Sequence, residues 1–212
     1  MRRPSKALLV LITGTGTEVG KTWVAARLAT VLRARGRRVA ARKPAQSFTP
    51  GAGATDAEVL AAATGERPEE VCPPHRWYEV AMAPPMAADL LGRPRFTITE
   101  LAAELRAPHD ADVVVVEGVG GVRSPLAHDG DTVTLAQALA PDSVVLVADA
   151  GLGVINAVLL STAALDGWPV RVVLNRFQAD DALHEANRRW LEQAGIAAVR
   201  DVDDLADQLP LG

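Results

Sequence analysis

Residues 14–22 read Gly-Thr-Gly-Thr-Glu-Val-Gly-Lys-Thr and decide the fold of this 212-residue chain. The segment follows an apolar run, Ala7 to Ile12, and opens a stretch with helical spacing, Lys21 to Arg35. Backbone N–H groups of such a glycine-rich turn bind phosphate oxygens, the lysine reaches the terminal phosphates, and the hydroxyl after it can ligate Mg²⁺. We therefore predict a phosphate-binding loop in which Lys21 and Thr22 carry the chemistry.

The spacing of this motif departs from the common G-x-x-x-x-G-K-T form. Counting back from Gly20, the position expected to hold glycine is Thr15, and Gly14 lies one residue earlier. The structural alternative is a glycine-rich turn between a strand and a helix, with an exposed lysine. The strand before the motif and the helix after it favour phosphate binding.

Short apolar runs alternate with helix-like stretches along the chain, which is typical of βαβ units on a parallel sheet. The predicted strands are Ala7 to Ile12, Arg38 to Lys43, Asp112 to Glu117, Ser143 to Asp149 and Val170 to Asn175. The predicted helices are Lys21 to Arg35, Asp56 to Ala63, Thr132 to Leu139, Val154 to Leu165 and Asp180 to Gln193. We expect one α/β domain, residues 1–212, with a parallel, doubly wound sheet of the P-loop NTPase type flanked by helices.

Two regions give weaker patterns. The Pro-rich stretch 65–94 is expected to be a long connection with one short helix near 86–91. Residues 178–212 are expected to hold one helix, a weak strand at 196–199 and a short tail. The four tryptophans are predicted to be core or interface anchors: Trp23, Trp77, Trp168 and Trp190.

Composition limits the class of function. The net charge is −4 and the arginines are spread along the chain, so nothing attracts nucleic acid. No stretch approaches the ~18 apolar residues that span a bilayer, and the N-terminal apolar run leads into the phosphate motif instead of a cleavage site. The lone Cys72 permits no intrachain disulfide and favours a reducing compartment. We expect a cytoplasmic protein that binds neither nucleic acid nor membrane.

Polar residues end several predicted strands, among them Lys43, Glu117, Asp149 and Asn175. Ligands of open α/β sheets bind beyond the carboxyl ends of the strands, so these residues predict a site. Glu117 ends a wholly apolar strand, where a bare carboxylate is costly unless a cation or several donors satisfy it. It could bind Mg²⁺, or it could cap the following turn.

Asp56 and Lys43 each allow two interpretations. Asp56 lies where a helix N-cap belongs, so capping competes with Mg²⁺ binding. Because Mg²⁺ prefers few protein oxygens plus substrate phosphates, Thr22, Asp56 and Glu117 would complete a shell with nucleotide oxygens. Lys43 could face the same crevice as Lys21 and stabilise charge on a transferring phosphoryl group, or it could be a surface lysine at a strand end.

Five ordered segments resemble the dethiobiotin synthetase family. They are Thr13 to Thr22, Lys43 to Ser47, Thr55 to Ala57, Val116 to Gly121 with Pro125-Leu126, and Gly151 to Asn156. In that family the phosphate-binding loop has the longer spacing seen here. The resemblance implies a homodimeric, Mg²⁺-dependent enzyme that converts 7,8-diaminopelargonate, CO₂ and ATP into dethiobiotin, ADP and phosphate. A carbamate and a carbamic-phosphoric anhydride precede closure of the cyclic urea.

Carried over by position, the resemblance implies roles for the matching residues. Lys43 and Lys21 would be catalytic, and Thr22, Asp56 and Glu117 would hold Mg²⁺. The nucleotide would contact Thr17, Glu18, Val19, Gly20, Lys21, Thr22, Asp56, Glu117, Gly118, Val119, Gly120, Asn175 and Arg176, with Asn175 at the base. The diamine would contact Thr17, Ser47, Gly121 and Asn156, the last from across a dimer interface.

The match has departures, and other functions stay open. Gly16 stands where many members have Asp, and the family's Gly-x-Ile-Pro-type loop beside the base is not clear after Phe177, so base preference is open. The alternatives are a paralogue with a changed substrate, an amidoligase-like relative, and a dimeric switch ATPase. An amidoligase would need a glutaminase domain with its cysteine. A switch ATPase would place a second lysine near the start of the loop, where this chain has Thr13 to Thr17.

Overall fold

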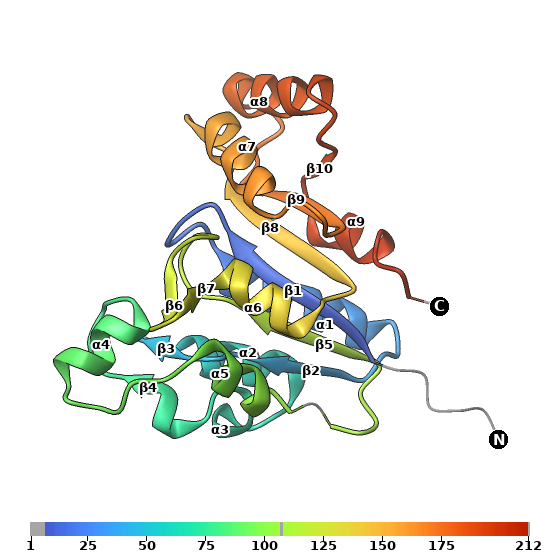
Figure 1. Cartoon of the computed structure of the whole chain (residues 1–212). Coiled ribbons are helices and arrows are strands. Elements are labelled where there is room, and N and C mark those ends of the chain that lie inside the picture. Colours follow the sequence, from blue (N-terminus) through green and yellow to red (C-terminus); the bar gives the residue numbers. More distant parts are fainter. Residues whose placement is uncertain (1–6, 107, 212) are drawn as a thin grey trace.

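The computed structural model describes residues 7–106 and 108–211 of the chain. Its central sheet has six parallel strands in the order β10-β9-β8-β1-β5-β2 (Figure 1). The strands are β1 (Leu8–Gly14), β2 (Val39–Arg42), β5 (Val113–Glu117), β8 (Ser143–Asp149), β9 (Val170–Asn175) and β10 (Ala198–Val199). The parallel α/β fold predicted from the alternation is confirmed.

Helices cover both faces of the sheet, because successive side chains of a buried strand point to opposite faces. Val10 and Ile12 of β1 pack on one side with α1 (Lys21–Ala34), α2 (Asp56–Thr64), α3 (Pro68–Val71) and α9 (Val202–Asp207). Leu11 packs on the other with α4 (Pro84–Leu90), α5 (Ile98–Glu104), α6 (Thr132–Leu139), α7 (Val154–Ala164) and α8 (Ala182–Gln193). The sheet is therefore doubly wound, as predicted.

Short elements occupy the regions where the sequence pattern was weak. Where one short helix was expected in 65–94, the structure has α3, the 3₁₀ turn η1 (Pro74–Arg76), β4 (Trp77–Tyr78) and α4; β4 pairs with β3 (Gln46–Ser47). A hairpin joins β6 (Pro125–Ala127) to β7 (Gly130–Asp131). The predicted C-terminal tail is wrong, because α9 forms there with Asp201 as its N-cap, the carboxylate accepting from Asp204 N at 2.8 Å.

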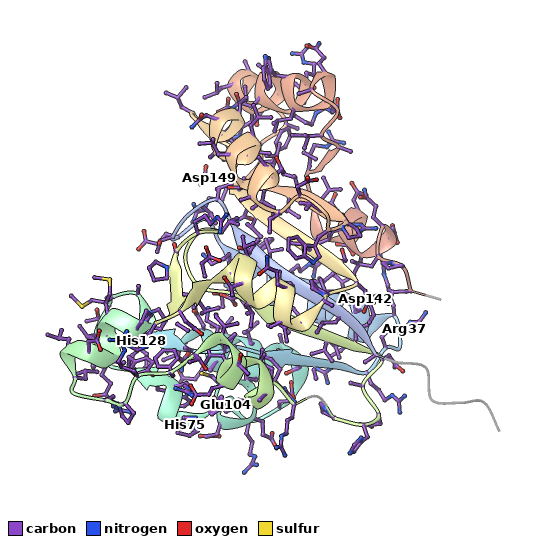
Figure 2. The ribbon with its side chains drawn as sticks, viewed as in Figure 1. Arg37, His75, Glu104, His128, Asp142 and Asp149 are labelled. Carbon is purple, nitrogen blue, oxygen red and sulfur yellow. The ribbon has the colours of Figure 1, made fainter. Side chains whose placement is uncertain are left out.

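Strand order places the phosphate-binding loop at the middle of one sheet edge. β1 lies between β5 and β8, with Ile12 opposite Glu117 and Gly14 opposite Val147. The loop after β1 therefore meets the carboxyl ends of both neighbours. Asp142 and Asp149 lie at opposite ends of β8, and Asp149 marks this carboxyl edge, beside the start of α7 (Figure 2).

In the described part of the chain, no helix combines the length and apolar character that a membrane crossing requires.

Candidate functional site

The phosphate-binding loop connects β1 to the first turn of α1. Its backbone is tied to β8, since Thr15 N donates to Val147 O at 2.9 Å. Lys21 Nζ donates to Gly16 O at 2.9 Å, so the buried side chain folds back over the loop. No side chain caps the start of α1, which leaves its first N–H groups pointing at the loop. This combination of free N–H groups and a lysine fits a phosphate chain.

Gly20 is required by the shape of the loop. Its φ is +91°, and a Cβ at this position would lie 2.0 Å from Asn175 Nδ2. The amide nitrogen of Asn175 donates to Val19 O at 2.9 Å, which holds the loop against the end of β9. A larger residue at position 20 would therefore displace either the loop or Asn175.

Arg176 also holds the phosphate-binding loop, and with the hydrogen bond from Asn175 to Val19 O it forms a clamp on the loop. Its Nη2 donates to Glu18 O at 2.9 Å, and its Nη1 lies 2.5 Å from Asp149 Oδ2. The other oxygen of Asp149 accepts from Gly151 N at 3.1 Å, just before α7. Two neighbouring residues at the end of β9 thus hold two neighbouring carbonyls of the loop. The sequence placed Asp149 at a strand end but assigned it no role.

Lys43 lies between two carboxylates. Its Nζ is 2.7 Å from Glu117 Oε1 and 2.7 Å from Asp56 Oδ2, and it donates to Gly118 O at 3.2 Å. Lys43 is only 2% exposed, so the surface-lysine interpretation is wrong. Thr22 Oγ1 joins the cluster, 2.9 Å from Asp56 Oδ1 and 2.9 Å from Glu117 Oε1.

Burial and neighbouring charges shift the pKa values of the side chains in this cluster. Burial opposes the charge on Lys43, but Glu117 and Asp56 outweigh burial and raise its pKa. Lys43 in turn lowers the pKa of Asp56. Burial raises the pKa of Glu117, against the opposing effect of Lys43. Burial, followed by repulsion from Lys43, lowers the pKa of Lys21. The two lysines therefore interact electrostatically with each other and with the carboxylates of Asp56 and Glu117.

The oxygens of Thr22, Asp56 and Glu117 fit a hard divalent cation. Glu117 Oε2 is buried and has no hydrogen-bond partner among the described residues. The hydroxyl of Thr22 carries one proton, so it can donate to only one of the two carboxylates that it meets. In the described chain no three His, Cys, Asp or Glu side chains gather as a metal cage, so phosphate oxygens would have to complete the shell.

The capping alternatives for the two carboxylates do not hold. Thr55 is the N-cap of α2, its side chain accepting from Glu58 N in a capping box, and this leaves the Asp56 carboxylate to the site. Within the described residues, Glu117 accepts from Lys43 and Thr22 and from no backbone N–H. Both side chains therefore face the phosphate-binding loop for reasons other than capping.

The remaining predicted residues lie in several different environments around the phosphate-binding loop. Thr17 and Gly121 line a cavity of about 520 Å³ together with Leu160 of α7. Ser47 Oγ is buried and has no partner among the described residues. Gly120 has φ +61°, and a Cβ at this position would lie 2.4 Å from Ser124 Oγ. Val119 packs against the core on the α6 and α7 side of the sheet. Asn156 is exposed near the start of α7, and no hydrogen bond in the described structure joins it to the other predicted residues.

A second cavity, of about 580 Å³, opens beside the loop at the end of β9. Its lining combines Gly20, Asn175, Arg176 and Phe177 with Trp23 and Arg27 of α1, Val173 of β9, and Arg200 to Asp203 at the start of α9. The sequence missed the contribution of residues 200–203. The available signal was Asp201 ahead of Val202-Asp203-Asp204, an N-cap followed by acidic residues in a first turn.

Curated relatives are similar to this chain over most of its length. A family model described as AAA domain matches residues 9–205. The ATP-dependent dethiobiotin synthetase BioD of Haloferax mediterranei is 39% identical over 186 residues, 86% of this chain and 78% of that protein. The BioD of Anaeromyxobacter dehalogenans is 40% identical over 179 residues, 81% of this chain and 78% of its own. The BioD of Ralstonia nicotianae is 37% identical over 205 residues, 89% of this chain and 86% of its own.

Solved structures support the fold alone. The signal recognition particle receptor FtsY of Elizabethkingia anophelis superposes with a TM-score of 0.54 at 16% identity, covering 95% of this chain and 62% of the receptor, so the chain spans less than two thirds of that protein. The septum site-determining protein MinD of Pyrococcus horikoshii gives 0.50 at 18% identity, covering 87% of this chain and 77% of MinD. Since the loop, the buried Lys43 cluster and about 40% identity to the synthetases coincide in one chain, the protein belongs to the ATP-dependent dethiobiotin synthetase family.

Proposed function

We propose that the protein is an ATP-dependent dethiobiotin synthetase, a cyclo-ligase of biotin biosynthesis. Its substrates are 7,8-diaminopelargonate, CO₂ and ATP, and its products are dethiobiotin, ADP and phosphate. The observation that carries this proposal is the placement of Lys43. A fully buried ammonium bridges Asp56 and Glu117 at 2.7 Å each, beside a phosphate-binding loop with its own lysine. The names of the relatives agree with this reading.

The residues divide the reaction between them. The loop from Thr17 to Gly20 and the first N–H groups of α1 bind the phosphates, while Lys21 and Lys43 stabilise the charge that develops when the carbamate oxygen attacks the γ-phosphate. Thr22, Asp56 and Glu117 would hold Mg²⁺, which supplies further neutralisation of the phosphate oxygens when bound. Both lysines are already buried at the site and hydrogen-bonded, Lys21 to Gly16 O and Lys43 to Glu117.

The diamine belongs on the Thr17 side of the loop. Ser47, Thr17 and Gly121 would contact it, and Asn156 would reach its carboxylate end from a second subunit, so we propose a homodimer joined near α7. Leu152 and Leu160 of α7 and its entry loop are exposed apolar side chains and support that interface. Asn175 and Arg176 would lie at the base end of the nucleotide. A cytoplasmic location follows from this biosynthetic role.

The test is phosphate release from ATP in the presence of Mg²⁺ and bicarbonate, measured with and without 7,8-diaminopelargonate. We expect release to depend on the diamine, and Lys43→Met to reduce it by roughly 10²-fold or more, since one preorganised charge at the transferring group is worth that much. Mass spectrometry of the product should show the cyclic urea.

Removing Lys43 leaves two carboxylates close together, so folding has to be checked separately. Thermal unfolding and ADP binding of Lys43→Met provide that check, and Lys43→Arg keeps the charge while moving it. Phosphate release that ignores the diamine would show that the substrate is wrong, and the paralogue reading would replace it. Diamine-dependent release that survives in a folded Lys43→Met protein would remove Lys43 from catalysis.

A further inference from the structure

The cavity of about 580 Å³ beside the loop is continuous with the phosphate-binding site. Gly20 belongs to the loop and also to the cavity wall, and Asn175 both holds Val19 O and lines the cavity. Trp23 follows Lys21 and Thr22 directly in the first turn of α1. A nucleotide whose phosphates lie on the loop therefore has only a short distance to cover before its nucleoside enters this cavity.

Trp23 is exposed in a way that calls for an occupant. Its side chain is 59% exposed, although most large apolar residues of α1 are buried in the core. Of the two predicted roles, core or interface anchor, the core position is therefore wrong. The indole stands in the wall of a cavity and not on a convex surface. Stacking a flat ring on this water-exposed aromatic face would be favourable.

The cavity lining also holds a second aromatic ring and a cation. Phe177 follows Arg176 after β9, and the guanidinium of Arg200 lies 5.8 Å from the centre of the Phe177 ring. Arg27 and Asp203 close the rim with an ion pair of 3.0 Å. The cavity thus has ring faces and a polar rim, which suit a planar heterocycle with hydrogen-bonding edges.

Resting on the proposed use of ATP, we propose that Trp23 is the stacking platform for the nucleobase and a main determinant of nucleotide affinity. Base–aromatic stacking does not read the identity of the base, so Trp23 supplies affinity while polar groups such as Asn175 select the base. The turn from Arg200 to Asp203 then takes the place of the base-flanking loop that the sequence did not show clearly.

The test compares binding of Mg-ADP with binding of Mg-tripolyphosphate, by calorimetry, in Trp23→Ala and in the matched variant Trp190→Ala. Trp190 is also exposed, at 45%, but it lies on α8 outside this cavity. We expect Trp23→Ala to raise the Kd for ADP about tenfold and to leave tripolyphosphate within about twofold, because stacking involves only the base. Trp190→Ala should change neither.

Intrinsic fluorescence gives a second readout. ADP should quench the wild-type protein and Trp190→Phe, whereas Trp23→Phe should bind ADP and lose most of the quench. Equal losses for ADP and tripolyphosphate in Trp23→Ala, or an unchanged Kd for ADP, would overturn the proposal. A tenfold loss specific to ADP, in a protein whose phosphate release ignores the diamine, would sustain Trp23 while refuting the proposed substrate.

Discussion

At the scale of single residues, the two carboxylate oxygens of Glu117 differ in their hydrogen bonding. Its Oε1 meets Lys43 and Thr22, whereas the buried Oε2 has no partner among the described residues. A buried acceptor left unsatisfied costs about 1–3 kcal/mol, so this site is less stable than it could be until a cation or donor arrives. A bound cation, such as the Mg²⁺ proposed above, would remove this cost.

Glu117→Gln should weaken Mg²⁺ while keeping the size of the side chain. We expect the Mg²⁺ concentration for half-maximal phosphate release to rise by roughly tenfold or more, since even residues that only orient metal ligands contribute 10–100-fold to affinity. Glu69→Gln makes the same chemical change at an exposed position and serves as the control. An unchanged Mg²⁺ titration in Glu117→Gln would place the metal elsewhere.

At the scale of elements, the turn between β1 and α1 depends on one glycine. Gly20→Ala adds a Cβ in a left-handed conformation and 2.0 Å from Asn175 Nδ2. Gly36 has a similar φ of +81° after α1, but nothing lies within 4 Å of an added Cβ. The two substitutions thus share the backbone penalty of about 1 kcal/mol and differ in the clash.

We expect Gly20→Ala to lose more stability than Gly36→Ala, by roughly 1–3 kcal/mol, and to lose ADP binding as well. Gly36→Ala should bind ADP normally. Urea unfolding measures the first difference and calorimetry the second. Equal stability and equal ADP affinity in the two variants would mean that Asn175 moves aside freely, and that the clamp on Val19 is unimportant.

The sequence predicted the elements whose signal is local. Five strands and the main helices follow from apolar runs and periodicity, and the loop follows from its motif. The motif located Thr22, the end of an apolar strand located Glu117, and the family resemblance favoured Asp56. The fold brings all three together with Lys43. Short pieces such as α3 and β4 went unpredicted, because four or two residues carry no periodicity.

Contacts between distant residues outside the recognised motifs could not be predicted. Arg176 reaches Glu18 across 158 positions of sequence and Asp149 across 27. Trp23 was predicted to be a core or interface anchor from its residue type alone, and residue type does not say which face of α1 the side chain occupies. Its exposure follows from the cavity that α1 forms with the end of β9 and the start of α9, and only the assembled fold decides that.

At the scale of the whole molecule, the proposed homodimer would be joined through α7. Leu160 is 66% exposed and also lines the cavity shared with Thr17 and Gly121. Leu160→Glu should therefore shift the protein from dimer to monomer in light scattering, because burying an unpaired carboxylate at an interface is costly. Leu183→Glu on α8, at a position that is 40% exposed, is the control. A Leu160→Glu dimer as tight as wild type would move the interface away from α7.

The position of β1 in the middle of the sheet also sets a timetable for the chain as it leaves the ribosome. Leu8 pairs with Val113 and Val10 pairs with Ser143, so β1 cannot pair with its neighbours until residues 113 and 143 have been synthesised. The anchor of Thr15 on Val147 arrives later still. Such long-range pairings are paid for in loop-closure entropy before they stabilise anything, which slows folding. A nascent chain therefore exposes its phosphate-binding motif well before Val147, the strand residue that anchors the loop, has been synthesised.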